Sequence, residues 1–392
     1  MTEALIGLAV LLVLAFLRIP IAFVMALVGF AGMAWVNSPI AALYNVGQTA
    51  FDAAINYELS VVPLFVLMGN FVARAHLAAE LYNASNAFLG HRKGGLAMAT
   101  VVACGGFSAI CGSSLATAAT MSKVAMPSMR RFGYSDALAS GSIAAGGTLG
   151  ILIPPSVLLV IYGILTQQSI GKLFAAGILP GLIGVLFYLF AVRYVTWRRP
   201  AEGPAADRQD WPQRMRALSS VWGVILLFAL VMGGIYGGVF SPTEAAGIGA
   251  VGAFAFALLR GALSWRILWE ILEESVATTA MLFAVLIGAL LFANFINFTD
   301  FPQALVRIAM GFQDTPWMVI ASILVIYILL GCVFESMSMI LLTVPIFYPL
   351  IVQLGYDPIW FGIVVVVVTE ISLITPPVGL NVFVLRGVLP DV

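Results

Sequence analysis

Long apolar stretches dominate the chain, and only short polar segments separate them. A helix needs about 20 mostly apolar residues to cross the hydrocarbon core of a bilayer. This pattern predicts an all-α protein that crosses the membrane many times, because a helix satisfies its backbone hydrogen bonds internally. The predicted spans, of which the first two are short, are residues 3–17, 20–36, 60–75, 173–192, 218–240, 242–259 and 275–297.

Four further regions are apolar but interrupted. Residues 95–129 and 317–352 each contain two apolar halves around a small or polar centre, which predicts re-entrant helical hairpins. Residues 135–166 and 357–387 are long and interrupted by Pro-Pro. Proline removes a backbone donor and clashes with the preceding turn, so these two regions are predicted to be broken helices.

Three polar-rich stretches are expected outside the hydrocarbon core. Residues 38–58 and 262–275 mix aromatic, polar and charged residues with apolar ones, which is typical of helices in the membrane interface. Residues 193–217 hold three prolines and six arginines and are predicted to form a cytoplasmic linker.

Composition excludes several classes of protein. Of the 392 residues, 62% are hydrophobic and 9% are charged, whereas soluble domains are about 25% charged. The net charge is zero and no basic tract occurs, which argues against nucleic acid as a partner. The two histidines and three cysteines show neither metal-ligand spacing nor a disulfide framework.

The charge order predicts the orientation of the chain. Glu3 precedes the first apolar stretch and Arg18 follows it, which is the reverse of a cleavable signal peptide. We therefore expect that the first helix is retained, with its N-terminus on the outer side of the membrane and Arg18 at the cytoplasmic face. In this topology fifteen Lys and Arg residues lie on the cytoplasmic side and two, Lys172 and Arg307, on the other.

An internal repeat relates the two halves of the chain. Pro154-Pro155 recurs as Pro376-Pro377, 222 residues later, and the same offset relates Gly133-Tyr134 to Gly355-Tyr356. Three single residues follow this offset too, namely Pro127 with Pro349, Ser114 with Ser336, and Pro20 with Pro242.

The charges that flank the two hairpins predict that the repeats are inverted. Basic residues border the first hairpin, which would enter from the cytoplasm, whereas Asp314 and Asp357 border the second. The predicted organisation is a first repeat over 1–192, the linker over 193–217 and a second repeat over 218–392. Inverted repeats with paired broken segments are typical of secondary transporters.

The interruptions carry the candidate chemistry. Small residues at Ser108–Ser114 let the backbone approach a ligand, and carbonyls freed at the breaks, with the Thr375 hydroxyl, suit Na⁺. Helix packing through small residues and plain proline kinks are the alternatives. Glu335, an acid at a predicted hairpin tip, could coordinate a cation, carry a proton or bond the opposite arm. Glu244 is expected to cap a helix, and Asn381 could point its amide at a substrate.

Five motifs together resemble the large membrane subunit of tripartite ATP-independent periplasmic (TRAP) transporters. The family usually has serine where Cys111 stands and commonly aspartate where Glu335 stands. Family chains also continue past Pro390-Asp391 into another hydrophobic segment, so this chain is interpreted as a truncated one. The motifs are Pro63-Leu-Phe-Val-Leu-Met-Gly-Asn70, Cys111-Gly-Ser-Ser-Leu-Ala-Thr117, Gly147-Thr-Leu-Gly-Ile-Leu-Ile-Pro-Pro-Ser156, Ser241-Pro-Thr-Glu-Ala-Ala246 and Thr375-Pro-Pro-Val-Gly-Leu-Asn381.

The resemblance implies a Na⁺-coupled symporter subunit, not an enzyme, in a bacterial inner membrane, with a periplasmic N-terminus. It implies an elevator mechanism, in which a transport domain with both hairpins and both broken helices slides against a scaffold. It also implies a small four-helix membrane subunit and a periplasmic binding protein that delivers a small organic acid, such as a C4-dicarboxylate or a sialic acid.

The resemblance also implies about two Na⁺ sites, built mostly from backbone carbonyls, and one substrate site. The first Na⁺ site would involve Ser108, Cys111, Gly150, Ile153 and Pro155. The second would involve Gly331, Ser372, Thr375 and Val378. The substrate would lie near Ser113, Ser114, Pro154, Glu335, Ser336, Pro376, Gly379 and Asn381.

Three other functions remain open. One is a stand-alone Na⁺- or H⁺-coupled carboxylate carrier that needs no binding protein. Another is an intramembrane enzyme, but Ser113 and Ser114 have no His or Lys partner nearby in the sequence. The last is a channel, although dead-end hairpins suit occlusion better than a continuous pore.

Overall fold

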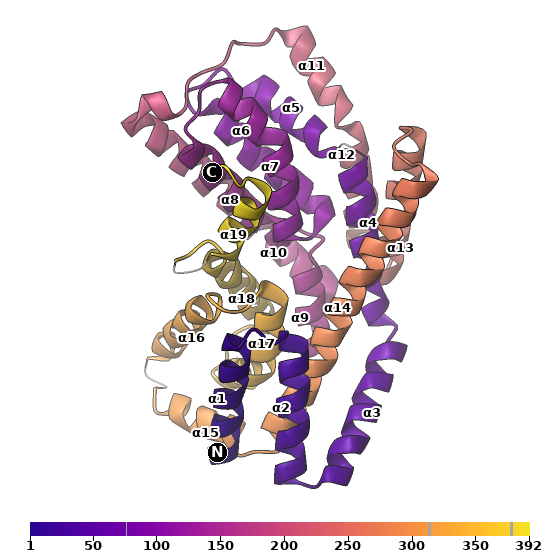
Figure 1. Cartoon of the computed structure of the whole chain (residues 1–392), viewed down its shortest axis with the longest axis vertical. Coiled ribbons are helices and arrows are strands. Elements are labelled where there is room, and N and C mark those ends of the chain that lie inside the picture. Colours follow the sequence, from indigo (N-terminus) through magenta and orange to yellow (C-terminus); the bar gives the residue numbers. More distant parts are fainter. Residues whose placement is uncertain (76, 313–314, 377–378) are drawn as a thin grey trace. The chain divides into compact units, whose positions relative to one another are not determined.

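The computed structural model describes residues 1–75, 77–312, 315–376 and 379–392. Within these ranges the regular structure is helical and no β-strand occurs (Figure 1). Five of the described helical stretches are long and apolar enough to cross a membrane, or up to seven if each of two bent helix pairs forms one span. The prediction of an all-α, multi-pass membrane protein is confirmed.

Both predicted hairpins form as pairs of helices. The first consists of α6 (Gly95–Cys111) and α7 (Ser114–Arg131), which run side by side (Figure 1). The second consists of α16 (Pro316–Leu330) and α17 (Ser336–Gln353). Asp314, which flanks the second hairpin in the sequence, lies outside the described residues.

Both predicted broken helices also form. The first is α8 (Asp136–Leu152) followed by α9 (Val157–Thr166), and the Pro154–Pro155 peptide bond between them is cis. The second is α18 (Pro358–Ser372) followed by α19 (Leu380–Val388). Pro377 of the second Pro-Pro pair lies outside the described residues.

Helix boundaries in the two halves follow the 222-residue offset found in the sequence. The return arms α7 and α17 both have 18 residues and begin at Ser114 and Ser336. Helices α8 and α18 begin at Asp136 and Pro358, which are separated by the same interval. The glycine after each return arm has positive φ, 75° at Gly133 and 78° at Gly355, a backbone conformation that favours glycine.

Among the remaining helices, one confirms a predicted cap. Helix α13 begins with the capping predicted for Glu244, because Ser241 N donates to Glu244 Oε2 (2.7 Å) and Glu244 N donates to Ser241 Oγ (3.3 Å). The helices are α1 (Thr2–Phe16), α2 (Ile21–Val36), α3 (Pro39–Ile55), η1 (Glu58–Ser60), α4 (Val61–Arg74), α5 (Leu77–Leu89), α10 (Ile170–Arg198), η2 (Pro200–Glu202), α11 (Trp211–Ser220), α12 (Trp222–Tyr236), α13 (Pro242–Leu259), α14 (Trp265–Asn297) and α15 (Phe301–Met310).

The chain forms two compact units that cut across the predicted repeats. Unit 1 comprises residues 1–60, 158–169 and 276–372, and unit 2 comprises residues 61–157, 170–275 and 373–392. Each unit therefore contains one hairpin, the first half of that hairpin's own broken helix, and the second half of the other broken helix.

Packing inside each unit supports this division. In unit 2, α6 and α7 pack on α8, and α19 packs on α7 and α8. In unit 1, α16 and α17 pack on α18, and Tyr162 of α9 donates a hydrogen bond to Pro358 O at the start of α18 (2.6 Å). The ring of Tyr162 also fills the space beside Gly362, where a Cβ atom would lie 2.5 Å from a ring carbon.

The predicted linker is shorter and better ordered than the sequence suggested. Helix α10 continues to Arg198, and α11 begins at Trp211. Between them, three backbone hydrogen bonds attach the chain to loops of unit 2: Gly94 N to Gly203 O (2.9 Å), Ser135 N to Glu202 O (3.0 Å) and Ala206 N to Gly90 O (3.0 Å). Residues 202–206 of the segment are thus held against loops of unit 2 by backbone hydrogen bonds.

Only one of the two stretches expected in the membrane interface forms a separate helix. Residues 38–58 contain the separate helix α3, whose apolar side chains are exposed, for example Ile40 at 83%. Residues 262–275 do not form a separate helix, because α14 runs without interruption for 33 residues from Trp265. That prediction is wrong: the charges there occupy only one end of a helix whose remainder is apolar.

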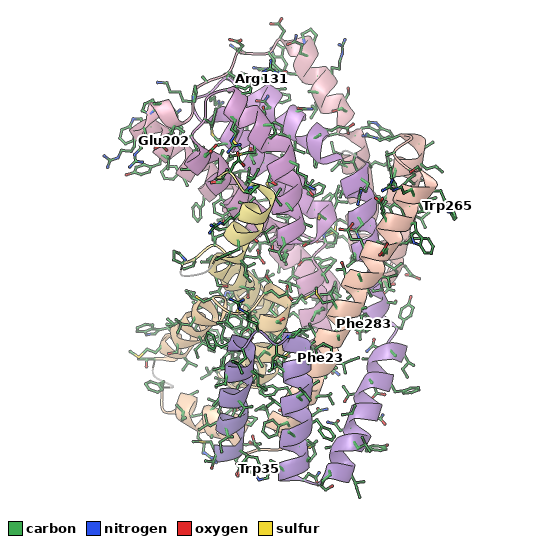
Figure 2. All side chains as sticks on the ribbon, viewed as in Figure 1. Phe23, Trp35, Arg131, Glu202, Trp265 and Phe283 are labelled. Carbon is green, nitrogen blue, oxygen red and sulfur yellow. The ribbon has the colours of Figure 1, made fainter. Side chains whose placement is uncertain are left out.

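Large apolar side chains cover much of the surface of both units. Trp35 near the end of α2 and Trp265 at the start of α14 are exposed at helix ends (Figure 2). Exposed tryptophans at helix ends are typical of membrane proteins, in which they lie at the level of the lipid headgroups.

Candidate ion and substrate sites

The first hairpin reverses within two residues. Helix α6 ends at Cys111, Gly112 adopts a left-handed conformation with φ 64°, and its N–H donates to Ser108 O (3.3 Å). Ser113 then caps α7, because its hydroxyl oxygen accepts a hydrogen bond from Ala116 N (3.3 Å). Glycine at the turn permits the positive φ, and serine satisfies an amide at the start of the return arm.

Helix α8 approaches this tip through two glycines. A Cβ atom on Gly150 would lie 2.6 Å from Ser113 O, and one on Gly147 would lie 2.9 Å from Ala118 Cβ. The break after α8 is close too, since a Cβ atom on Gly112 would lie 3.5 Å from Pro155 O. The structure therefore brings together the hairpin tip, Gly150 and the first Pro-Pro break, as the first predicted ion site requires.

The side chains of this predicted site are already engaged. Ser108 Oγ donates to Cys104 O (2.5 Å), and Ile153 packs against Gly181. Cys111 O faces α4, where a Cβ atom on Gly69 would lie 2.9 Å from it. Thr117 Oγ1, early in the return arm, is fully buried and has no hydrogen-bond partner. Carbonyl oxygens plus an unpartnered buried hydroxyl are a donor set that fits a hard cation such as Na⁺.

The second hairpin, in unit 1, has a longer turn. It spans Gly331–Glu335, and Glu335 occupies the N-cap position of α17 without a side-chain capping bond. A Cβ atom on Gly331 would overlap the Ser372 side chain, so these two predicted ion-site residues are in contact. Ser372 Oγ donates to Thr369 O (2.6 Å), in the last turn of α18.

A buried carboxylate lies beside this hairpin. Glu370 in α18 is 3% exposed and accepts a hydrogen bond from Ser336 Oγ (3.1 Å), at the first residue of α17. Glu335, the acid selected from the sequence, is only half-buried and accepts a longer bond from Ser338 Oγ (3.4 Å). Glu370 was not among the predicted site residues. A lone acid after the apolar run 361–368 is nevertheless a sequence feature that indicates a functional position in a membrane protein.

Comparison with known proteins identifies the family. Residues 8–391 match the family described as "Tripartite ATP-independent periplasmic transporter, DctM component". The chain belongs to the DctM family. The resemblance stated from the motifs is thereby confirmed, as is the expectation that the protein is not an enzyme, since its relatives are named transporter permease proteins.

Three relatives show the range of this family. The C4-dicarboxylate TRAP transporter large permease protein DctM of Pseudomonas aeruginosa is 39% identical over 342 residues, which is 86% of this chain and 79% of that protein. The sialic acid TRAP transporter large permease protein SiaM of Vibrio cholerae is 31% identical over 391 residues, covering 96% and 90%. The isethionate TRAP transporter permease protein DctMQ of Oleidesulfovibrio alaskensis is 33% identical over 344 residues, covering 88% and 54%.

The remaining predicted residues of this DctM-family chain divide between the units. Thr375, Pro376 and Gly379 belong to unit 2, whereas Gly331 and Ser372 belong to unit 1. Val378 lies outside the described residues. Asn381 is fully buried at the start of α19, where its Nδ2 donates to Ala144 O in α8 (3.4 Å) and its Oδ1 has no partner. Of the residues predicted for the substrate site, Ser113, Ser114 and Pro154 lie in unit 2, and Glu335 and Ser336 lie in unit 1.

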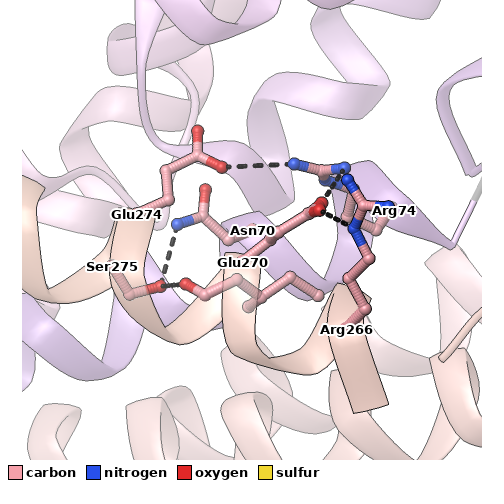
Figure 3. Close-up of polar contacts among 7 residues, drawn as sticks. Asn70, Arg74, Arg266, Glu270, Glu274 and Ser275 are labelled. Carbon is pink, nitrogen blue, oxygen red and sulfur yellow. Dashed lines mark hydrogen bonds and ion pairs between the residues drawn. The ribbon is translucent and has the colours of Figure 1, made fainter. Parts of the chain in front are cut away.

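A polar cluster between α4 and the first third of α14 also escaped the sequence analysis (Figure 3). Asn70, the last residue of a family motif, donates to Ser275 Oγ (2.8 Å), and Ser275 Oγ donates to Ile271 O (2.7 Å). Arg74 lies 3.4 Å from Glu270 and 3.7 Å from Glu274. Exposed ion pairs contribute about 0–1 kcal/mol each, so the partly buried Asn70–Ser275 hydrogen bond is the stronger attachment of α14 to α4.

Proposed function

We propose that this chain is the membrane-embedded transport subunit of a Na⁺-coupled secondary importer of small organic acids. C4-dicarboxylates and sialic-acid-like carboxylates are the proposed substrates, because relatives that share most of this chain's length are named for them. The observation that carries the proposal is the paired arrangement of a hairpin tip against a broken helix, present once in each unit.

Two inverted repeats are part of the proposal. Their support is the common 222-residue offset of the return arms, of the first halves of the broken helices and of the left-handed glycines. Opposite charges flank the two hairpins in the sequence, which supports the inversion. Transporters built this way bind their ions and substrate at discontinuous helices near the midplane of the bilayer.

Residues of the first hairpin and break would hold one Na⁺. Gly150, Ile153 and Pro155 would supply backbone oxygens from the break, and Ser108 and Cys111 would supply them from the hairpin. The ion, when bound, would neutralise the carbonyl dipoles that converge there. Because the tip and the break both contribute, Na⁺ would favour the conformation in which they are in contact. Gly331 and Ser372, which are in contact within unit 1, are proposed to hold a second Na⁺. Thr375 and Val378 stay candidates for ion contacts on the sequence alone.

The N-terminus of α7 is the proposed contact for a substrate carboxylate. Helix N-termini carry partial positive charge and free amides, and therefore favour anions. Ser113 and Ser114 begin α7 without an acid, whereas an acidic residue, Glu335, stands at the N-cap of α17. The first hairpin therefore suits an anionic substrate better than the second, whose acids suit a cation.

An elevator mechanism and two partner proteins complete the proposal. The hairpins and broken helices would move together relative to the scaffold helices. A periplasmic binding protein would deliver the substrate, and a small four-helix membrane subunit would support the scaffold in a bacterial inner membrane. The family description, which names a tripartite periplasmic transporter, and the relative named DctMQ support these partners.

Reconstitution tests the proposal directly. Proteoliposomes that contain this chain and its small subunit, supplied with the binding protein, should take up a radiolabelled organic acid only under an inward Na⁺ gradient. Uptake by this chain alone would instead favour a stand-alone carboxylate carrier. Uptake that ignores Na⁺ but follows a pH gradient would contradict Na⁺ coupling.

A substitution tests the second ion site. Thr375→Val removes a hydroxyl oxygen with little change in volume, so it should raise the Na⁺ concentration needed for half-maximal uptake. Thr166→Val is a matched control, because it makes the same change at a buried threonine outside the predicted ion sites, whose hydroxyl donates to Tyr162 O (2.7 Å). An unchanged Na⁺ dependence in Thr375→Val would argue against a side-chain contact there.

A further inference from the structure

A buried arginine in unit 2 has no partner for one edge of its guanidinium group. Arg214 in α11 is 6% exposed, and its Nε and Nη2 atoms are buried without a hydrogen bond. Its guanidinium carbon lies 5.8 Å from the ring centre of Phe88 in α5 and 5.5 Å from that of Trp211. Cation–π contacts stabilise such a charge, but they do not replace the hydrogen bonds that its N–H groups lose on leaving water.

The unpartnered atoms form the edge of arginine that recognises oxyanions. Nε and Nη2 present two nearly parallel N–H groups, which pair with two oxygens of a carboxylate or a phosphate. The nearest acid on the same helix is already engaged, since Asp210 caps α11 in a capping box with Gln213. In the ranges that the structure covers, no ion pair involves Arg214.

The surroundings of Arg214 are positively charged. His91, in the turn between α5 and α6, has a buried Nδ1 atom without a partner. Burial lowers the pKa of His91, and the positive charges of Arg214, Arg208 and Arg92 lower it further. Arg92 follows His91 in the chain and Arg214 packs on Phe88 just before this turn, so positive charge lies beside the turn and favours a bound anion.

The same place lies at the predicted surface of the membrane. Helix α11 is followed directly by the apolar helix α12, at a bend of 45°. Trp211, Met215 and Leu218 are exposed at spacings of three or four residues, which places them on one face of α11, and Trp222 at the start of α12 is exposed too. A helix with tryptophans on an exposed apolar face is typical of the headgroup level of a bilayer. The abundant anions at the headgroup level of a bilayer are the phosphate groups of phospholipids.

We propose that Arg214, with Arg208 and Arg92, binds the phosphate group of an anionic phospholipid where α11 meets the turn after α5. The backbone bond from Ala206 N to Gly90 O holds the segment before α11 against this turn, so the two sources of charge are fixed relative to each other. The ring of Trp211, which lies beside the Arg214 guanidinium group, is 63% exposed, so this part of α11 borders the surface of the protein. The site is independent of the transport mechanism proposed above.

Lipid-dependent stability of the full chain tests this proposal. The purified protein would be mixed with phosphatidylglycerol, with phosphatidylcholine or with inorganic phosphate, and thermal unfolding and native mass spectra recorded. We expect phosphatidylglycerol to raise the melting temperature by several degrees and to remain bound, with little effect of phosphatidylcholine. Arg214→Gln should abolish this shift and weaken binding about tenfold. Arg216→Gln, an exposed position on the same helix, should behave like the wild type.

The other outcomes are equally informative. Equal shifts by both lipids, or an equal phosphatidylglycerol shift in Arg214→Gln, would overturn the proposal. A shift by inorganic phosphate alone that depends on Arg214 would assign the site to a soluble phosphate and overturn the lipid as its source. If Arg214→Gln does not fold, the exposed pair Arg92→Gln/Arg208→Gln should still lower the phosphatidylglycerol shift, and an unchanged shift there would count against the site.

Discussion

The return arms of the two hairpins have matching boundaries, but the hairpins differ in their turns and in their chemistry. Their return arms have the same length and the same place in the repeat. In the first hairpin, the glycine at the contact belongs to the broken helix, and Gly150 meets the backbone of Ser113. In the second, the glycine belongs to the hairpin, and Gly331 meets the side chain of Ser372. One contact is therefore made with backbone and the other with a side chain.

Charge separates the two hairpins further. An uncharged serine, Ser113, caps the first return arm, whereas Glu335 stands at the N-cap of the second, whose first residue, Ser336, donates a hydrogen bond to Glu370. Position 148, which corresponds to Glu370 at the repeat offset, holds a threonine whose hydroxyl donates to Ala145 O (2.7 Å). The repeat thus preserves backbone geometry while it changes side-chain chemistry, as expected if one hairpin meets an anionic substrate and the other favours a cation.

The largest expected effect comes from Gly150→Ala. The added Cβ would lie 2.6 Å from a backbone oxygen and 2.9 Å from a backbone carbon of Ser113. Neither atom can rotate away, so we expect a loss of about 3 kcal/mol in the free energy of unfolding and loss of Na⁺-driven uptake. Gly141→Ala in the same helix meets nothing within 4 Å and should be neutral or slightly stabilising. Equal stability of both variants would refute the close contact.

Gly331→Ala should have a smaller effect that can be reversed. The new methyl group overlaps the Ser372 side chain, so we expect a loss of about 2 kcal/mol in the free energy of unfolding. The double variant Gly331→Ala/Ser372→Gly removes the overlapping atoms and should recover most of this loss in thermal unfolding. Failure of the double variant to recover would show that the second contact, like the first, is made with backbone.

Glu370→Ala tests the side-chain contact that distinguishes the second hairpin. It leaves the buried Ser336 hydroxyl without its acceptor, which should cost about 1.5 kcal/mol in chemical unfolding. Glu370→Gln keeps an acceptor oxygen but removes the charge, and should unfold much like the wild type. A Gln variant that retains stability and loses Na⁺ dependence of uptake would show that the carboxylate charge serves the ion.

The smallest effects concern the caps of the return arms. Ser113→Ala removes the bond from Ala116 N and should cost about 1 kcal/mol. Glu335→Ala should cost less, because Glu335 makes no side-chain capping bond. Hydrogen exchange at the first turns of α7 and α17 would measure both effects. Faster hydrogen exchange in Glu335→Ala than in Ser113→Ala would contradict the prediction that the Ser113 cap contributes more stability.

Local signals in the sequence were enough to locate the elements. The hairpin predicted over 95–129 forms over 95–131, and the broken helix predicted over 135–166 forms over 136–166. Apolar runs, glycines and prolines act on the backbone next to them, so their effects can be predicted without knowing the fold. The Ser241–Glu244 cap was predictable for the same reason.

Partners far apart in the chain were not predictable. Ser336 and Glu370 are separated by 34 residues, and Asn70 and Ser275 by 205. The charges in residues 262–275 suggested a separate helix in the membrane interface, but α14 runs without interruption from Trp265 to Asn297, and its charged end contacts α4. Arg214 looked like one of six arginines in a linker, and only packing against Phe88 and Trp211 shows that it is buried.

The sequence by itself determined that this protein is a helical membrane protein of the DctM family with two paired hairpins and breaks. Hydrophobic length and backbone chemistry decide those features residue by residue. Only the tertiary structure decided that each compact unit combines one hairpin with halves of both broken helices. It also decided which glycines touch backbone, which acid is buried and which arginine lacks a partner, because burial depends on surfaces that distant segments bring together.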